Sequence, residues 1–368
     1  MSPRAFLTLV VATAIAVVAA IVLIVTEQVV EVDTAQGQPM FPSLQAGPVD
    51  NLSQVTLETP RYRLVMERRE SGWVSIERGD YPIRQAYLGD LVASLAAMTI
   101  VERKTDNPDW YDEIDVDGPQ AEGSESLRVT ATASDGTVLA DAFIGIRSTS
   151  IGFAATRGGT FVRNVDEAQS WLVEGDIQFP NSLNDWFGQI VNIPGPQVAS
   201  VAIYAGEELL LKADKIDFQT GDYEISYLDP SVGPEGSTAA DDAVRGVTQG
   251  IVSTNFIEAR PRDTVTFPED GRRVQFTTQS GLTLIVSLGE ADGQVWAAYD
   301  ASAEPDSAAV ATAADITAKT ANWAFTLPTP RLGPLQRDIN VLFVPPAPVE
   351  EPVEEAPPVL LPVLPGGP

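Results

Sequence analysis

The sequence predicts an α+β protein built from tandem duplicated units of antiparallel β-sheet, each covered by a helix and preceded by one transmembrane helix. Three observations predict this: an uncharged apolar run near the amino terminus, alternating apolar and polar runs that turn at glycine, and a hairpin–helix–hairpin order that occurs twice. The expected segments are a cytoplasmic amino terminus at 1–5, a transmembrane signal anchor at 6–26, a linker at 27–55, a first repeat unit at 56–197, a second repeat unit with a carboxyl-terminal helix at 198–344, and a disordered Pro/Glu-rich tail at 345–368.

The apolar run FLTLVVATAIAVVAAIVLIV covers residues 6–25 and carries no charge. Twenty residues in a helix span about 30 Å, the thickness of a bilayer core. Arg4 precedes the run and acidic residues follow it, so the positive-inside rule predicts that the bulk of the chain lies outside the cytoplasm. A cleaved signal peptide is the alternative, but its apolar core would be shorter, and cleavage after Ala20 would leave IVLIV behind. We therefore expect an uncleaved anchor.

The first unit opens with YRLVMERRESGWVSIER at 62–78, whose two alternating runs meet at Glu70-Ser71-Gly72 and predict a hairpin. A helix is expected over 87–104, because apolar residues recur at the spacing of one helix face: Leu88, Leu91, Val92, Leu95 and Met98. The elements expected after it are a hairpin over 127–145 that turns at Asp135-Gly136, and short strands near Phe161 and Trp171.

The second unit repeats this order. Its expected elements are a hairpin over 198–214 around Gly206, strands at 216–218 and 223–227, a helix over 241–260, a hairpin over 272–289 that turns at Ser280-Gly281, a strand at 294–302 and a further helix at 306–321. The two main helices are expected to end alike, with TIVERK at 99–104 and NFIEAR at 255–260. This order predicts an internal duplication. The tail from Pro345 holds nine prolines and four glutamates, which favours an extended segment, either flexible or a docking arm.

Composition excludes several classes of chemistry. The formal net charge of -28 argues against binding to nucleic acid, whose phosphates would be repelled. The chain has no cysteine and no histidine, which excludes thiol nucleophiles, Ser-His-Asp triads and metal sites that need imidazole or thiolate ligands. No catalytic residue and no cofactor are expected.

Several motifs resemble one bacterial family in order and spacing. GTFVRNVDEAQSWLVEGDIQFPNSLNDWFGQIVNIPGPQVASVAI at 159–203 resembles the signature stretch of the domain of unknown function 4340. Further matches are WVSI at 73–76, YPI at 81–83, NPDWY at 107–111, DGTVLAD at 135–141 and NWAFTLP at 322–328. Members are typically anchored in the bacterial inner membrane and often lie beside ABC-type transport components of the gliding-motility kind. The resemblance implies a periplasmic location and ABC permease and ATPase subunits as partners, but no site residues.

The acidic stretch DEIDVDG at 112–118 has the alternation with which a calcium-binding EF-hand loop begins. Its candidate ligands are Asp112, Asp115 and Asp117. An EF-hand needs a bidentate glutamate at position 12, and counting from Glu113 places Ser124 there. In the family resembled, this stretch is a tight turn in which a glycine usually stands at the position of Asp115. The favoured interpretation is a solvated acidic loop on that turn.

Other candidate sites involve carboxylates and tryptophans. Asp106, Asp109, Asp112 and Asp115 could act in pairs as in a glycosidase, although a surface charge run is the favoured interpretation. Trp73, Trp171 and Trp296 fall in expected strands and are predicted to be core residues. Trp110, Trp186 and Trp323 fall at element boundaries and are the candidates for contact with a partner.

The sequence favours a non-enzymatic accessory or scaffolding subunit of an ABC-type transport or envelope complex, held in the inner membrane by residues 6–26. Two alternatives stay open. One is a module that binds a small ligand or a cation between the two repeats, and the other is an envelope glycosidase that uses carboxylates.

Overall fold

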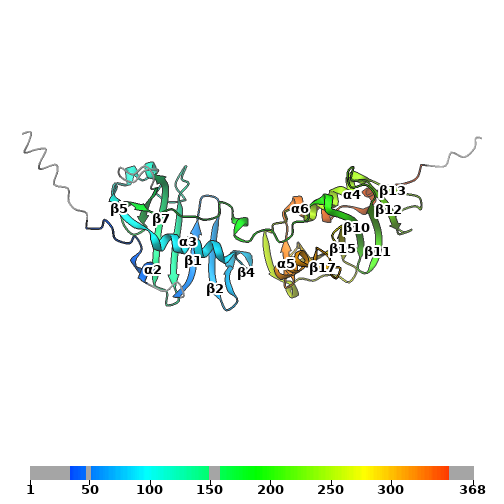
Figure 1. Cartoon of the computed structure of the whole chain (residues 1–368), viewed down its shortest axis with the longest axis horizontal. Helices are drawn as coiled ribbons and strands as arrows, with labels where there is room; N and C mark the ends of the chain where they lie inside the picture. The colour runs from blue at the N-terminus through cyan, green and yellow to red at the C-terminus, as the bar shows by residue number, and fades with distance from the viewer. Residues whose placement is uncertain (1–33, 47–50, 149–157, 348–368) are drawn as a thin grey trace, which may run out of the picture. The chain divides into compact units, whose positions relative to one another are not determined.

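The computed structural model describes residues 34–46, 51–148 and 158–347 (Figure 1). The chain is an α+β protein with antiparallel sheets, and it divides into two compact units, unit 1 at residues 1–188 and unit 2 at residues 189–368. The sequence placed this boundary after residue 197. The expected anchor at 6–26 lies outside the described residues, and none of the described helices is long and apolar enough to cross a bilayer.

Unit 1 contains a nine-stranded antiparallel sheet with the order β4-β3-β2-β1-β6-β7-β8-β9-β5. Its strands are β1 (Leu52–Glu58), β2 (Arg63–Arg69), β3 (Gly72–Ser75), β4 (Tyr81–Pro82), β5 (Thr99–Arg103), β6 (Leu127–Ala133), β7 (Val138–Ser148), β8 (Gly159–Asn164) and β9 (Ser170–Glu174). The expected hairpins form as β2–β3 and β6–β7. At the centre of the sheet, β1 pairs with β6, with Val55 opposite Ala131 and Leu57 opposite Val129.

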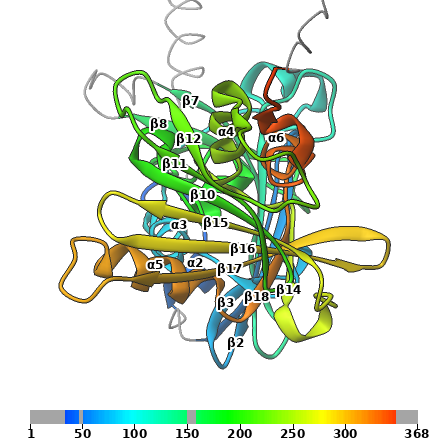
Figure 2. The same cartoon turned by 90° about the vertical axis from the view of Figure 1, so that its right-hand side faces the viewer.

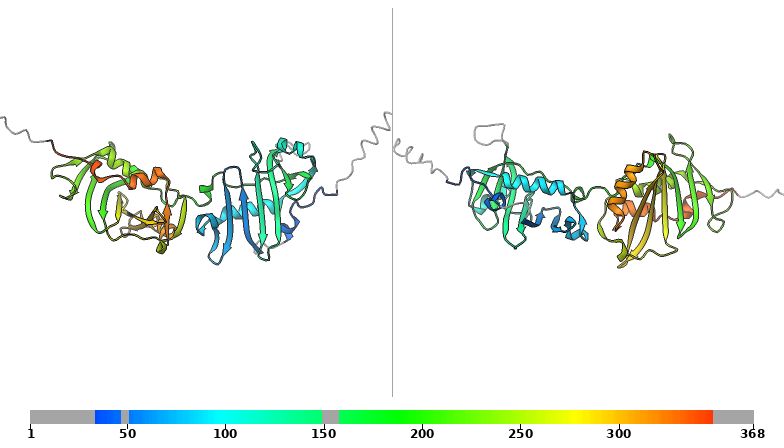
Figure 3. Two further views of the ribbon diagram at one scale, coloured as in Figure 1. Left: turned by 180° about the vertical axis from the view of Figure 1, so that it is seen from behind. Right: turned by 60° about the horizontal axis from the view of Figure 1, so that its bottom comes forward.

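Helix α3 (Gln85–Ala97) runs across the strands of this sheet and covers one of its faces (Figure 1, Figure 3). The predicted apolar stripe is confirmed, because Leu88, Leu91, Val92 and Leu95 are all buried. The expected extent of 87–104 was wrong, since the helix ends at Ala97 and residues 99–103 form β5. The run Thr99-Ile100-Val101 is β-branched, which favours a strand that pairs with β9 at the sheet edge.

Part of the span predicted as a linker belongs to the fold of unit 1. A short helix, α2 (Pro42–Ala46), is preceded by Met40 and Phe41, and both of these side chains are buried. The backbone beside them follows the free edge of β5, where the Ile100 amide donates to Gln38 O at 2.9 Å. The expectation of a linker to residue 55 was therefore wrong at these residues, because their apolar side chains complete the core and their backbone covers a sheet edge.

Unit 2 contains an eight-stranded sheet with the order β12-β11-β10-β15-β16-β17-β18-β14 (Figure 2). Its strands are β10 (Val198–Ala205), β11 (Glu208–Lys215), β12 (Tyr223–Leu228), β14 (Glu258–Pro261), β15 (Arg272–Thr278), β16 (Leu282–Ala291), β17 (Gln294–Ala303) and β18 (Trp323–Thr326). The remaining elements are a two-stranded sheet of β13 (Thr238–Ala239) and β19 (Phe343–Val344), and the helices α4 (Asp241–Thr248), α5 (Val310–Thr320) and α6 (Thr329–Leu335).

The two large sheets share one strand order. Read from β3 to β5, the order in unit 1 corresponds strand for strand to the order from β12 to β14 in unit 2. The central β1–β6 pair corresponds to β10–β15, and α3 and α4 occupy the same place in chain order. TIVERK and NFIEAR, expected to end the two helices, instead contribute to β5 and β14. The similarity between the two motifs is therefore a similarity between two edge strands that hold corresponding positions in their sheets.

Three expected elements of unit 2 differ from the structure. The helix expected over 241–260 ends at Thr248 and gives way to a 3-10 turn over Gln249–Ile251. Glycine is unfavourable in a helix interior, and an added Cβ at Gly250 would lie 2.6 Å from the Leu335 side chain of α6. The strand expected at 216–218 is a turn in which the Asp217 carboxylate accepts the Gln219 amide at 2.7 Å. The helix expected from 306 begins at Val310, since Asp306 has a φ of 63°.

Trp186 anchors the core of unit 1. Its side chain is 0% exposed, and its indole N–H donates to the Tyr62 hydroxyl at 3.3 Å. Tyr62 in turn donates to Pro180 O at 2.8 Å, and the Tyr87 ring meets the indole edge-on with centroids 6.1 Å apart. The indole ring is therefore packed against another aromatic ring, and its only polar atom forms a hydrogen bond.

Replacing Trp186 by alanine should lower the free energy of unfolding of unit 1 by about 3–5 kcal/mol, because it removes a fully buried indole and leaves a cavity. Trp110, whose side chain is 52% exposed, provides the matched control, and W110A should change the same quantity by less than about 0.5 kcal/mol. The measurement is urea unfolding followed by circular dichroism. Equal effects of the two substitutions would contradict the burial of Trp186.

Candidate functional site

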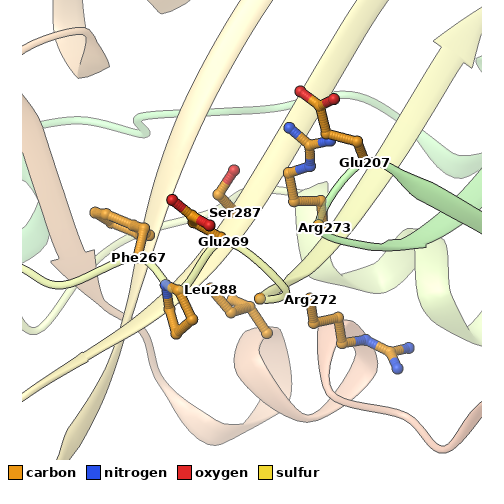
Figure 4. Close-up of a pocket in the computed structure, with 10 residues that line it drawn as sticks. Glu207, Phe267, Glu269, Arg272, Arg273, Ser287 and Leu288 are labelled. Carbon is orange, nitrogen blue, oxygen red and sulfur yellow. The ribbon is translucent and has the colours of Figure 1, made fainter.

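A cavity of about 550 Å³ lies on one side of the unit 2 sheet (Figure 4). The turn between β10 and β11, the segment that precedes β15, the start of β15 and the middle of β16 line it. Its volume falls in the range of pockets that hold small ligands. None of its residues was a candidate at the level of sequence.

Two turns at the wall of this cavity are tied together. The Gly206 amide donates to Gly271 O at 2.8 Å, and the Gly271 amide donates to Pro268 O at 2.9 Å. Gly206 has a φ of 59°, and an added Cβ there would lie 2.1 Å from Glu269 O. Only glycine allows this approach, so the two turns hold a fixed spacing.

The sheet register places Arg273 within the cavity, between Tyr204 on β10 and Ser287 on β16. The guanidinium lies over the Tyr204 ring, 5.9 Å from its centroid. Among the described residues, no carboxylate forms an ion pair with Arg273. Its neighbour Arg272 points to the other side of the sheet (Figure 4). Arg272 donates to Leu335 O and Arg337 O at 2.8 and 2.6 Å, and burial lowers the pKa of its guanidinium. Arg272 is therefore structural, whereas Arg273 is available to a ligand.

Two carboxylates complete the charged lining. Glu207 lies beside Arg273 at one end of the cavity, and Glu269 lies beside Ser287 at the other (Figure 4). Within the described residues neither carboxylate forms a hydrogen bond or an ion pair. Phe267 contributes an apolar ring next to Glu269 (Figure 4). The arrangement can bind charged groups of both signs beside an apolar one.

A smaller cavity of about 200 Å³ in unit 2 contains Lys215 and Arg245. Lys215 donates to Gly195 O at 3.1 Å, and burial together with the charge of Arg245 lowers the pKa of its ammonium. Burial also raises the pKa of the neighbouring Tyr223 hydroxyl to about 12. Arg245 is paired with Asp242. Lys215 is thus a cation that fastens the segment before β10 to the end of β11.

The three candidate metal ligands do not converge. Asp112 is exposed, whereas Asp115 is 8% exposed and accepts hydrogen bonds from the Ser124 hydroxyl at 2.7 Å and the Glu125 amide at 3.1 Å. One Asp117 carboxylate oxygen is buried without a hydrogen-bond partner. In the part of the chain that the structure describes, no three acidic side chains gather as a metal site would require.

The interpretation of the acidic stretch as a solvated loop was wrong at Asp115. This residue has a φ of 56°, the left-handed conformation that glycine adopts most readily, and its carboxylate binds the following turn instead of water. The loop packs closely on the sheet, because an added Cβ at Gly145 of β7 would lie 2.1 Å from Ile114 O. Asp115 is a structural residue of a packed turn.

Of the four carboxylates in the paired-carboxylate alternative, Asp106, Asp109 and Asp112 are exposed, and Asp115 is buried and hydrogen-bonded within its own turn. The carboxyl groups with shifted pKa values lie elsewhere. Hydrogen bonds from Thr137, Gln219 and Ser231 lower the pKa of the carboxyl groups of Asp135, Asp217 and Asp229 respectively. A glycosidase needs a general acid whose pKa is raised. These three carboxylates instead cap turns.

The three tryptophans predicted as partner contacts differ in how far their side chains are exposed. Trp110 is 52% exposed and borders a cavity of about 430 Å³ that also includes Arg103, Lys104 and Ile114. Trp186 is fully buried, so its assignment as a contact residue was wrong. Trp323 is half-buried in β18 and is engaged by neighbours. Of the tryptophans predicted to be core residues, Trp171 and Trp296 are buried and Trp73 is half-buried.

Comparison with known proteins gives no match: no family model, no curated protein and no solved structure matches this chain. The family resemblance, and the location and partners that it implies, stay predictions.

Replacing Asp115 by alanine should lower the free energy of unfolding by about 1–3 kcal/mol, because the Glu125 amide and the Ser124 hydroxyl lose their acceptor. D112A, on the exposed side of the same turn, should change it by less than about 0.5 kcal/mol. Differential scanning calorimetry with and without millimolar calcium measures both effects. A calcium-dependent rise in melting temperature that D115A abolishes would overturn the structural role.

Proposed function

We propose that this chain is a membrane-anchored extracytoplasmic protein of the bacterial inner membrane, and that it acts as a non-enzymatic accessory or scaffolding subunit of an ABC-type transport or envelope complex. Residues 6–26 would form the anchor, and the two units would lie in the periplasm. The permease and ATPase subunits of the complex would be the partners.

The observation that carries this proposal is the exposure of Trp110. Tryptophan is highly buried on average, and it is among the residue types most enriched where protein interfaces gain their affinity. Here the ring stands beside a cavity that also offers Ile114 and the basic side chains of Arg103 and Lys104. An aromatic anchor, an aliphatic neighbour and a polar rim are the composition of a contact site.

The architecture supports the same proposal. The shared strand order of the two large sheets fits an internal duplication, in which one sheet-and-helix unit was copied in tandem. Two tandem units give one chain more surface for its partners. When two contacts are linked in one chain, the overall affinity exceeds that of either contact alone. The net charge of -28 would keep such a surface soluble and selective for basic partner regions.

The test is an affinity purification of the tagged full chain from gently solubilised native membranes, with the co-purifying proteins identified. The wild-type chain should recover ABC permease and ATPase subunits in a constant ratio. W110A should weaken the association by about 2 kcal/mol, or roughly thirtyfold, as truncation of an interface hot spot does.

The matched control is V138A, because Val138 is 54% exposed on the same unit but lies at the β6–β7 turn instead of beside the Trp110 cavity. It should recover the partners as the wild type does. Recovery of no transporter subunit by the wild-type chain would contradict the proposed function. Undiminished recovery by W110A would overturn the assignment of the contact site.

A further inference from the structure

The cavity of Figure 4 brings together charged groups of both signs that form no ion pair with any residue that the structure describes. Arg273 has only the Tyr204 ring as a partner, and Glu207 and Glu269 form no ion pair within the described residues. Arg273 is half-buried, whereas Glu207 and Glu269 are exposed. A half-buried cation without an ion pair costs free energy that an anionic group of a ligand would recover. The acidic character of the chain makes a lone, unpaired guanidinium in a cavity notable, since carboxylates outnumber cations 51 to 23.

We propose that this cavity binds a small zwitterion with an apolar side chain, that is, an α-amino acid or a short peptide. In this arrangement Arg273 receives the carboxylate of the ligand, and the ammonium lies at the end where Glu269 and the Ser287 hydroxyl are found. The apolar side chain of the ligand packs against Phe267.

The positions of the side chains support this orientation. Figure 4 shows Arg273 and Glu269 at separate ends of the cavity, with Ser287 next to Glu269 and the Phe267 ring beyond it. A ligand with only a negative charge would be attracted by Arg273 but repelled by the two carboxylates. A ligand with only a positive charge would be repelled by Arg273. A molecule that carries both charges can place its carboxylate on Arg273 and its ammonium on Glu269, and charge-assisted hydrogen bonds are the stronger class of hydrogen bond.

The walls of the cavity are preformed. The Gly206–Gly271 and Gly271–Pro268 hydrogen bonds fix the turns that carry Glu207 and Glu269. Arg273 stands on a strand paired on both sides, and its guanidinium is held over Tyr204. Groups that are already positioned lose little conformational freedom on binding, which favours affinity for a small ligand.

The test is isothermal titration calorimetry of the full chain with four probes. L-Leucine and leucyl-leucine carry both charges, leucine amide lacks the carboxylate, and N-acetyl-leucine lacks the ammonium. We expect at least one of the two zwitterions to bind, and each blocked derivative to bind at least tenfold more weakly than the tighter zwitterion. The tighter of leucine and leucyl-leucine identifies the source of the zwitterion.

Variants assign the roles of the side chains. R273Q and E269Q should each weaken binding of the zwitterion at least tenfold. Two controls should leave it unchanged: E208Q, in an exposed neighbour of Glu207 that does not line the cavity, and R61Q, in an exposed ion pair of unit 1. Circular dichroism confirms that each variant is folded.

No saturable binding of either zwitterion up to about 10 mM would overturn the proposal. Equal binding of leucine and leucine amide would also overturn it, because the carboxylate would then make no contact with Arg273. The inference stands apart from the proposed function, since recovery of membrane partners through Trp110 neither requires nor excludes a ligand in unit 2.

Discussion

The central pairing of β1 with β6, and of β10 with β15, is the constraint on which each unit depends. In both units this antiparallel pair joins an amino-terminal hairpin to a second group of strands that follows a long connection containing the helix. Without it the sheet of unit 1 would separate into groups of four and five strands, and that of unit 2 into groups of three and five, each with a smaller face to bury. The pairing sets the register that places apolar side chains under α3 in unit 1, and in unit 2 helix α4 lies against β10 (Figure 2).

The same pairing positions the candidate sites. In unit 2, the β10–β15 register sets Tyr204 opposite Arg273, and the β15–β16 register adds Ser287, so the cavity is a consequence of alignment across three strands. In unit 1, the connection between β5 and β6 returns the chain to the central pair. Its turn at Asp115 packs on β7, and Trp110 stands exposed a few residues before it. The Trp110 site therefore lies on an irregular segment held by the sheet, whereas the unit 2 cavity combines strand residues with the turns beside them.

Much of the fold could be predicted from the sequence because its signals are local. Glycine-containing turns marked the hairpins, and the stripe of Leu88, Leu91 and Leu95 marked the face of α3. The ends of the helices could not be predicted, since pairing of β5 with β9 and the packing of Gly250 against Leu335 are tertiary effects. For the candidate sites, position at an element boundary favoured exposure, which the structure shows for Trp110 but not for Trp186, whose indole is buried against Tyr62 far away in the sequence. The cavity around Arg273 was not predicted from the sequence, because its lining comes together only when three strands are paired in register.

Native-state hydrogen exchange tests the dependence of each unit on its central pair most directly. The backbone amides of β1 and β6 in unit 1, and of β10 and β15 in unit 2, should exchange more slowly than all others in their unit. Their free energies of opening should equal that of unfolding the whole unit. Exchange of these amides as fast as that of the β2–β3 and β11–β12 hairpins would contradict the account, because the outer hairpins would then be stable without the pair that joins them.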